Sequence, residues 1–366
     1  GGEVDQVYSG NTAEVLNAVD SRYIAVAMLS STKAICAFRN NSTTYLNAVV
    51  VNYGSASGAT SAVNAEASLD ISIAAQTSTQ ATVVYKTSTG ATKAYVLDVS
   101  GTTITPGSVA SVDAGTGGSG TSITALSSTQ LLCAYQGGAA GTPRMRVFDI
   151  SGSTITASSE VAADATAAAA TYIKVRKISS SKAVVAFRNN TGNKPQIRLQ
   201  SITGSTPAPT GSVLDISATP GTTPATALGI AVLSSSRAVL VAPIDRSYGD
   251  LMISLLDISG TSATLVRNKI ISVGSNGTVD ADAIKIDSNT VYATWTGGGS
   301  LGSDAIVIRI TSDDKIVVYP VADQIEPSVS ASPGYLAADA LDSTHVVQLC
   351  RNASTYLSAK VVEIAA

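Results

Sequence analysis

Three arginine–asparagine pairs recur at one aligned position of the sequence, and their side chains are well suited to binding. They are Arg39–Asn40, Arg188–Asn189 and Arg351–Asn352, each directly after an apolar run. Guanidinium and amide groups suit the hydroxyls and carboxylates of sugars. The alternative is that each pair only ends a strand, because asparagine tolerates turn geometry. A further copy carries Asp245, Arg246 and Tyr248 at the equivalent connection. The predicted binding residues are Arg39, Asn40, Arg188, Asn189, Asp245, Arg246, Tyr248, Arg351 and Asn352.

Acidic residues also recur, one residue before a Ser-Gly turn or its equivalent. They are Asp98, Asp149, Asp257 and Glu363. Acids at the same place in every copy are expected to fix a local turn, and the alternative is that they form an acid–base pair. The single histidine, His345, aligns with Lys33 and Lys182, so we expect it near a turn at the start of a strand.

Catalytic and metal-binding patterns are weak. Asp280, Asp282 and Asp287 lack the glycine-bounded loop that calcium sites use. A glycosidase needs two carboxylates at a defined separation, and the connections that carry the arginine pairs offer only Asp245, Asp250 and Asp304. We therefore predict no catalytic residue, no cofactor and no metal ion.

The pairs stand inside a repeat. The phrase Leu29-Ser30-Ser31-Thr32-Lys33, which runs on to Phe38, recurs so that the chain holds seven copies. The copies end at Phe38, Tyr85, Tyr135, Phe187, Ala242, Trp295 and Cys350, which are 47 to 55 residues apart. A period near 50 with strand-type patterning is typical of β-propeller blades.

A second phrase, such as Val96-Leu97-Asp98-Val99-Ser100-Gly101, follows most copies of the first and indicates a hairpin, because glycine supplies the positive φ of a tight turn. Each unit therefore reads as four strands. The fold class we predict is all-β, a single seven-bladed propeller that fills residues 1–366. The blade cores are expected near residues 21–70, 71–120, 121–168, 169–222, 223–278, 279–332, and 333–366 together with 1–10.

The two ends of the sequence fit a closed ring. The last unit stops at Ile364, where its fourth strand should begin, and Glu3–Tyr8 resembles such a strand. We expect the N-terminal strand to supply it, because closure removes the open edges that invite aggregation.

Composition limits the partners. The net charge is −3, the isoelectric point is about 5.2, and no Lys/Arg cluster occurs, which argues against a nucleic-acid partner. No apolar run is long enough for a membrane span, and no signal peptide is visible. Cys36, Cys133 and Cys350 lie in apolar runs and are expected to be buried free thiols. Trp295 is expected in the core.

The two repeated phrases resemble β-propeller repeats of bacteriophage virion proteins and environmental bacterial surface proteins. That resemblance implies a tail, fibre or host-attachment component at a virion or extracellular surface. We therefore expect a non-enzymatic protein that uses one face to bind a neighbouring subunit or a surface glycan. Two alternatives stay open: a secreted or cell-surface lectin-like adhesin, and a propeller glycosidase.

Overall fold

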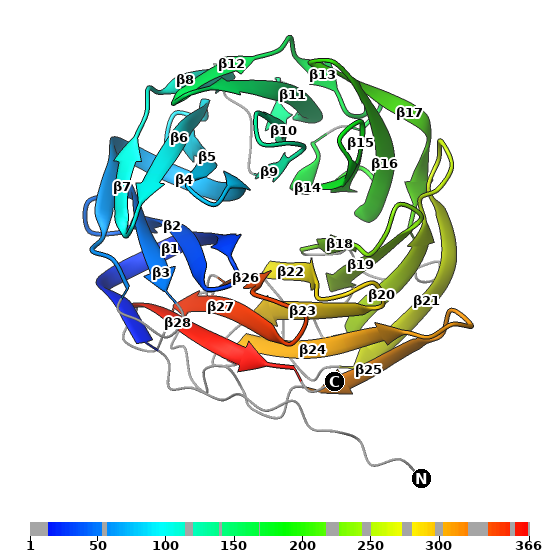
Figure 1. Ribbon diagram of the computed structural model, residues 1–366. Coiled ribbons are helices and arrows are strands. Elements are labelled where there is room, and N and C mark those ends of the chain that lie inside the picture. Colours follow the sequence, from blue (N-terminus) through cyan, green and yellow to red (C-terminus); the bar gives the residue numbers. More distant parts are fainter. Residues whose placement is uncertain are drawn as a thin grey trace.

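The computed structural model of the protein describes residues 14–52, 57–113, 120–138, 141–167, 169–216, 227–243, 250–272, 280–296, 303–320, 336–351 and 356–364. These residues form strands and turns and contain no helix, so none of them forms a helix that could cross a membrane. Figure 1 shows the sheets arranged like blades around a central opening, which is a β-propeller arrangement.

Four of the sheets are separate antiparallel units, each numbered here from the ring centre outwards. One contains β9 (Thr121–Ala125), β10 (Gln130–Gly137), β11 (Thr142–Ser151) and β12 (Thr154–Ala157), with β13 (Val161–Ala162) also on β11. The next contains β14 (Thr171–Ser179), β15 (Lys182–Asn189), β16 (Lys194–Thr203) and β17 (Thr206–Asp215). The third contains β18 (Gly229–Val232), β19 (Arg237–Pro243), β20 (Asp250–Asp257) and β21 (Thr264–Ser272). The fourth contains β22 (Asp280–Lys285), β23 (Thr290–Thr296), β24 (Ser303–Ile310) and β25 (Ile316–Pro320).

The remaining strands form one continuous sheet of eleven. Its order is β26 (Leu336–Ala340), β27 (His345–Arg351), β28 (Tyr356–Glu363), β1 (Glu14–Ser30), β2 (Lys33–Asn40), β3 (Tyr45–Asn52), β4 (Ser61–Thr77), β5 (Gln80–Thr87), β6 (Thr92–Ser100) and β7 (Thr103–Pro106), with β8 (Ala110–Asp113) also on β6. The sheet is continuous because β1 and β4 are long and each pairs in two halves. In β4, residues 61–67 pair with β3 and residues 68–77 pair with β5.

The two ends of the chain meet in this sheet. Residues 14–20 of β1 pair with β28, with Glu14 opposite Ala359 and Asp20 opposite Tyr356. Residues 21–30 then pair with β2. The expected pairing of the N-terminal segment with the last strand is therefore present through residues 14–20. The segment Glu3–Tyr8, which we expected to make it, lies outside the described residues.

The core lies between neighbouring sheets. Phe187 and Val185 of β15 and Leu240 of β19 are fully buried, and one apolar cluster joins residues of β15 and β16 to residues of β19 and β20. Middle strands are covered on both faces in this way, which is why their sequences read as unbroken apolar runs. Trp295 is 2% exposed, which confirms its place in the core. His345 begins β27 beside the turn at Asp342, as expected.

A repeated polar contact, here called the turn latch, ties each of several four-strand repeats to the next. A long polar side chain at the start of the second strand of one repeat donates to the glycine carbonyl of the next repeat's hairpin. The bonds are Lys33 Nζ to Gly101 O (3.1 Å), Gln80 Nε2 to Gly152 O (3.1 Å), Gln130 Nε2 to Gly204 O (3.1 Å) and Lys182 Nζ to Gly260 O (2.8 Å). The first three glycines have φ between 56° and 62°, a conformation that glycine adopts without strain.

The latch also explains the repeated acids and corrects part of our expectation. Asp98 accepts a bond from Gln80 (2.7 Å) and one from Ser153 of the next sheet. Asp149 likewise accepts from Gln130 (2.9 Å) and from Ser205. These acids therefore join sheets rather than fix their own turns, because the next hairpin supplies a hydroxyl within reach. Asp257 behaves as expected, since its carboxylate accepts the Ser259 amide of its own turn at 2.8 Å. The residues that follow Glu363 in its turn lie partly outside the described residues.

The thiol groups give a first prediction. Cys36 and Cys133 are free and fully buried, as expected, and burial raises the pKa of both thiols above the ordinary range. The side chain of Cys350 lies outside the described residues. We expect a thiol reagent at neutral pH to leave Cys36 and Cys133 unmodified in the native protein and to modify them in denaturant. Mass spectrometry of peptides will measure this, and rapid native labelling of either residue would show that its strand is not buried.

The pairing of β1 with β28 gives a second prediction. A chain that begins at residue 21 lacks the part of β1 that pairs with β28, so β28 keeps only β27 as a neighbour. Its melting temperature should fall by at least about 4 °C, because ladder bonds and packing are lost together. A chain that begins at residue 11 keeps residues 14–20 and is the control. Calorimetry will compare the three chains. Equal melting temperatures for the chains that begin at residues 11 and 21 would contradict the pairing.

Candidate functional site

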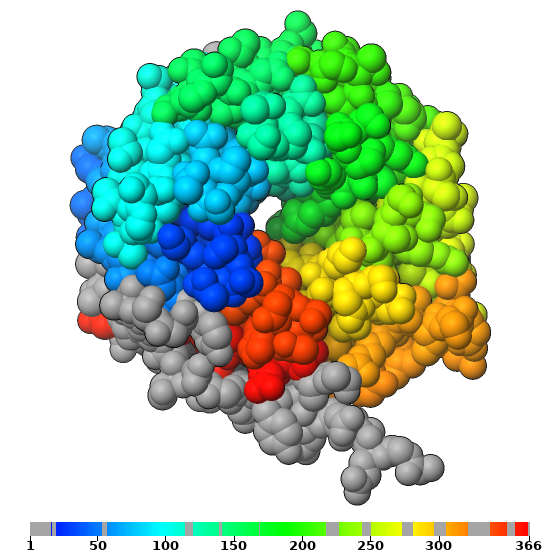
Figure 2. Space-filling model, viewed as in Figure 1, coloured from blue at the N-terminus to red at the C-terminus, as the bar shows by residue number. Residues whose placement is uncertain are grey.

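The innermost strands enclose a cavity on the axis of the ring, here called the axial pocket. It is lined by residues 23–28, 70–75, 120–125, 172–174, 176–177, 231–232, 282–285 and 337–339, and its volume is about 670 Å³. Figure 2 shows the opening at the centre of the molecule. Small-molecule sites commonly have volumes of roughly 300–1,000 Å³, so the pocket is large enough for a small ligand.

The wall of the pocket is polar because the innermost strands are sheet edges. An edge strand leaves amide groups without a strand partner, and side chains of the preceding sheet accept bonds from some of them. Ser72 Oγ accepts from the Ile123 amide at 3.2 Å, and Ser122 Oγ accepts from the Val175 amide at 3.0 Å. Thr124 Oγ1 accepts from the Lys177 amide at 3.3 Å. Short hydroxyl side chains thus satisfy the edges and leave the centre of the ring open.

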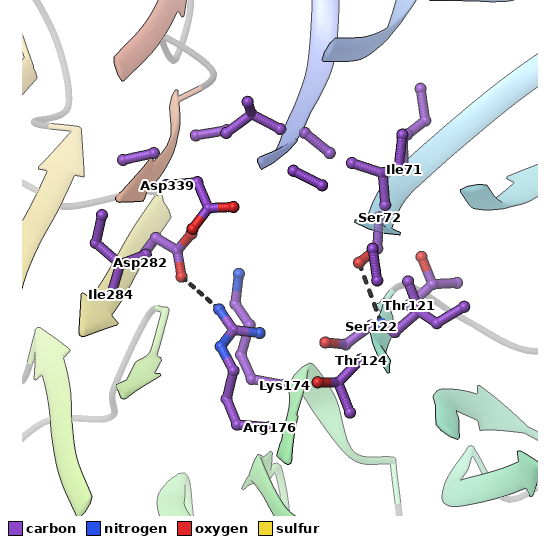
Figure 3. A pocket seen from close by; sticks show the side chains of 18 of the residues that line it. Ile71, Ser72, Thr121, Ser122, Thr124, Lys174, Arg176, Asp282, Ile284 and Asp339 are labelled. Atoms are coloured by element: carbon purple, nitrogen blue, oxygen red, sulfur yellow. Dashed lines mark hydrogen bonds and ion pairs between the residues drawn. The ribbon is translucent and has the colours of Figure 1, made fainter. Parts of the chain in front are cut away.

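Charged side chains face the pocket from three of these strands. Arg176 of β14 donates through Nη2 to Asp282 Oδ1 of β22 at 3.0 Å, and through Nη1 to the Val175 carbonyl at 3.1 Å. The same Asp282 oxygen accepts the Ala283 amide at 2.9 Å. Figure 3 shows Asp339 of β26 beside Asp282, with Arg176 and Lys174 facing them.

Asp339 carries the most perturbed charge in the pocket. Its two oxygens accept the Met28 amide (2.8 Å) and the Ala340 amide (2.9 Å). Burial raises the pKa of Asp339 to about 6, the two amide bonds and Arg176 oppose that rise, and the negative charge of Asp282 adds to it. Near neutral pH this carboxyl group can therefore exchange a proton.

Lys174 is a cation of the pocket to which no acid is bound among the described residues. It lies two residues before Arg176 on β14, so both side chains point to the same face of the strand. Figure 3 shows it directed into the cavity. Its ammonium has no hydrogen-bond or ion-pair partner among the residues that the structure describes, and it is half-buried.

One end of the pocket has a strained backbone. Tyr23, Asp70 and Tyr172 have φ of 51°, 46° and 52°, and each lies where the pairing register of its strand shifts. Residues other than glycine rarely adopt this conformation, and such strain concentrates at functional sites. All three residues line the pocket. The carboxylate of Asp70 accepts the Gly120 amide at 3.2 Å, and burial raises its pKa.

The predicted binding residues are only partly described. Arg39 is the last residue but one of β2 and places its guanidinium 5.9 Å from the ring centre of Tyr23, a residue that lines the pocket. Asn40 accepts the amides of Ser42 (3.0 Å) and Thr43 (3.4 Å).

The second pair behaves similarly. Asn189 accepts the Thr191 amide at 3.0 Å, and Arg188 donates to Asn193 at 2.5 Å. Both asparagines thus have the turn role that we considered as the alternative. Arg351 ends β27. Its side chain lies outside the described residues, as do Asp245, Arg246, Tyr248 and Asn352 entirely.

The charged cluster of the pocket, which is Lys174, Arg176, Asp282 and Asp339, was not predicted from the sequence. Carboxylates near the axis were sought only in the connections that carry the arginine pairs, whereas Asp282 and Asp339 line the pocket from β22 and β26. We had considered Asp282 only for calcium, and no cluster of three metal-ligating side chains occurs among the described residues. A usable signal was the segment Tyr172–Arg176, in which two cations alternate with apolar residues on an innermost strand.

Comparison with known proteins supports the fold. No protein-family model matches the chain, and no curated protein sequence matches it significantly. A protein of unknown function from Dyadobacter fermentans is similar with a TM-score of 0.54 at 10% identity, over 98% of this chain and 97% of that one. A mutant of the Aleuria aurantia lectin AAL in complex with Fucalpha1-6GlcNAc is similar with a TM-score of 0.50 at 12% identity, over 85% and 99%.

NanB in complex with Optactamide is similar with a TM-score of 0.53 at 11% identity, over 99% of this chain and 70% of that one. At these identities the similarity concerns the fold alone. The protein is therefore an all-β protein of propeller arrangement, and its axis holds a polar, charged pocket.

Asp339 gives a prediction on pH. An unfolded aspartate has a pKa of about 3.9, and the folded value is about 6, so the folded state binds the proton more tightly. The contribution of Asp339 to the free energy of unfolding therefore rises as the pH falls from 7.5 through 6 towards 4.5. An Asp339→Asn variant lacks this proton. The melting temperature of the parent minus that of the variant should increase over this range, and a difference independent of pH would contradict the raised pKa.

Proposed function

We propose that the protein is a non-enzymatic, lectin-like β-propeller that binds a carbohydrate in the axial pocket. The observation that carries the proposal is the pocket itself, with hydroxyl groups on one wall and charged groups on another. Sugars present many hydroxyl groups that both donate and accept, and sites that bind them need several polar groups at fixed positions. The glycan-bound lectin among proteins of similar fold supports this proposal.

This proposal replaces our first expectation. The comparisons give no support to a virion structural role and favour the carbohydrate-binding alternative. A location on an extracellular surface, as a secreted or cell-surface adhesin has, goes with that alternative. The predicted binding residues would extend the site, since Arg39 contacts a tyrosine of the pocket.

We also propose that the propeller has seven blades and is a single closed domain. Four blades are the separate sheets, and the sheet of eleven strands would supply three more, divided where β1 and β4 change partners. The outer strand of the last blade would then be residues 14–20 of β1. Seven sequence repeats support this count.

Glycoside hydrolysis is a second candidate, and one observation favours it. Asp339, whose pKa is about 6, lies beside Asp282 in the pocket, and glycosidases pair a protonated carboxyl group with an ionised one. Arg176 already binds Asp282 and amides bind Asp339, which fits binding better than catalysis. Release of nitrophenol from a panel of nitrophenyl glycosides, abolished by Asp339→Asn, would establish hydrolysis and overturn the non-enzymatic proposal.

A glycan array tests carbohydrate binding. We expect the intact protein to bind a restricted set of glycans, and an array without any bound glycan would overturn the proposal.

Alanine variants test whether the predicted binding face takes part. The positions are Arg39, Arg188, Asp245, Arg246, Tyr248 and Arg351. Arg39 and Arg188 are half-buried, and alanine removes the contact of Arg39 with Tyr23 and the hydrogen bond of Arg188 to Asn193. These two changes should each lower the free energy of unfolding by about 1 kcal/mol and leave the protein folded. The combined variant should bind the same glycans more weakly, and unchanged binding would limit the site to the axial pocket.

A further inference from the structure

We propose that the saccharide bound in the axial pocket carries one carboxylate, as a uronic acid does, and that this carboxylate binds the ammonium group of Lys174. This inference rests on the proposed carbohydrate-binding function and names the chemical class of the ligand.

Lys174 and Arg176, the two cations on the same face of β14, are unequally paired. Asp282 holds Arg176 at 3.0 Å, and the Val175 carbonyl accepts a second bond from the same guanidinium. Lys174 has no such partner among the described residues, although it is half-buried and directed into the pocket. A partly desolvated charge without a counter-ion is unfavourable, and a bound anion removes that cost. The ammonium group of Lys174 therefore favours a ligand that carries an anionic group.

Hydroxyl side chains on one wall of the pocket, here called the hydroxyl wall, favour a saccharide over a simple carboxylate. Ser72, Ser122 and Thr124 use their oxygens to accept backbone amides. Ser122 is buried, whereas Ser72 and Thr124 are half-buried, so the hydroxyl protons of these two stay available to a ligand oxygen. Figure 3 shows these side chains on one side of the pocket and the acids on the other, with Lys174 between them. A bare carboxylate would reach Lys174 but leave the hydroxyl wall without ligand contacts. A sugar ring fills the remaining volume and supplies those contacts.

The two acids of the pocket limit the ligand to one negatively charged group. Asp282 and Asp339 lie together opposite the hydroxyl wall. Their oxygens can accept bonds from sugar hydroxyls, but their negative charge repels a second carboxylate or a phosphate. One anionic group at Lys174, with neutral hydroxyl groups elsewhere, is the arrangement that the charges of the pocket accept.

The experiment compares ligands by isothermal titration calorimetry on the full chain, with D-glucuronate, its uncharged methyl ester, and acetate. We expect glucuronate to bind at least about 10-fold more tightly than the methyl ester, because the ester keeps the ring and loses the charge. Acetate should bind more weakly than glucuronate.

Substitutions then locate the charge. Lys174→Gln should remove the preference for glucuronate over the ester, and Lys174→Arg should retain most of it. The matched control is Lys194→Gln, which removes the same charge from an exposed position at the start of β16. It should bind glucuronate as the parent does. Calorimetric melting of each variant will show that it is folded, and Lys174→Arg carries the test if Lys174→Gln does not fold.

Three results would overturn the inference while leaving carbohydrate binding intact on the glycan array. They are equal affinity for glucuronate and its ester, glucuronate binding that a folded Lys174→Gln variant keeps, and no uronic acid bound although neutral glycans are. Acetate that binds as tightly as glucuronate would overturn the saccharide part. If no glycan binds at all, the proposed function fails, and this inference fails with it.

Discussion

The structure depends on how the edges of the innermost strands are satisfied. The strand segments that line the axis have a strand neighbour on one side only, and this holds for the inner halves of β1 and β4 as well. Here the preceding sheet supplies short acceptors, Ser72, Ser122 and Thr124, to amides of the next strand. Because these side chains are small, they complete the edges without filling the axis. The same solution therefore stabilises the ring and creates a polar pocket.

Asp339 both accepts an amide of a strand edge and brings a titratable group into the pocket. It occupies the same role as the serines, since it accepts the Met28 amide of the next strand. As an acid it also brings a charge, and the nearby Asp282 and Arg176 form an ion pair in the same pocket. Farther from the axis, the turn latches repeat with little variation. The chemistry of the side chains thus varies at the axis and is regular at the rim.

Sequence predicted the scaffold well because its signals are local and repeated. The four-strand unit, the glycine turns and the buried Trp295 follow from patterns within about fifty residues. The pocket could not be predicted in the same way, because Arg176, Asp282 and Asp339 come from three separate strands. The turn latches were missed for the same reason, since Asp98 meets Ser153 of the next repeat. The arginine–asparagine pairs were predicted as binding residues because they recur. Their asparagines recur because they stabilise the same turn in two repeats, as Asn40 and Asn189 do.

The central claim is that the axial pocket is the ligand site, and a crystal structure of the full chain with glucuronate tests it most directly. The account predicts one sugar on the axis, its carboxylate about 3 Å from Lys174 Nζ and its hydroxyl groups against Ser72 and Thr124. A sugar bound between outer strands, with the axis occupied by water alone, would contradict it.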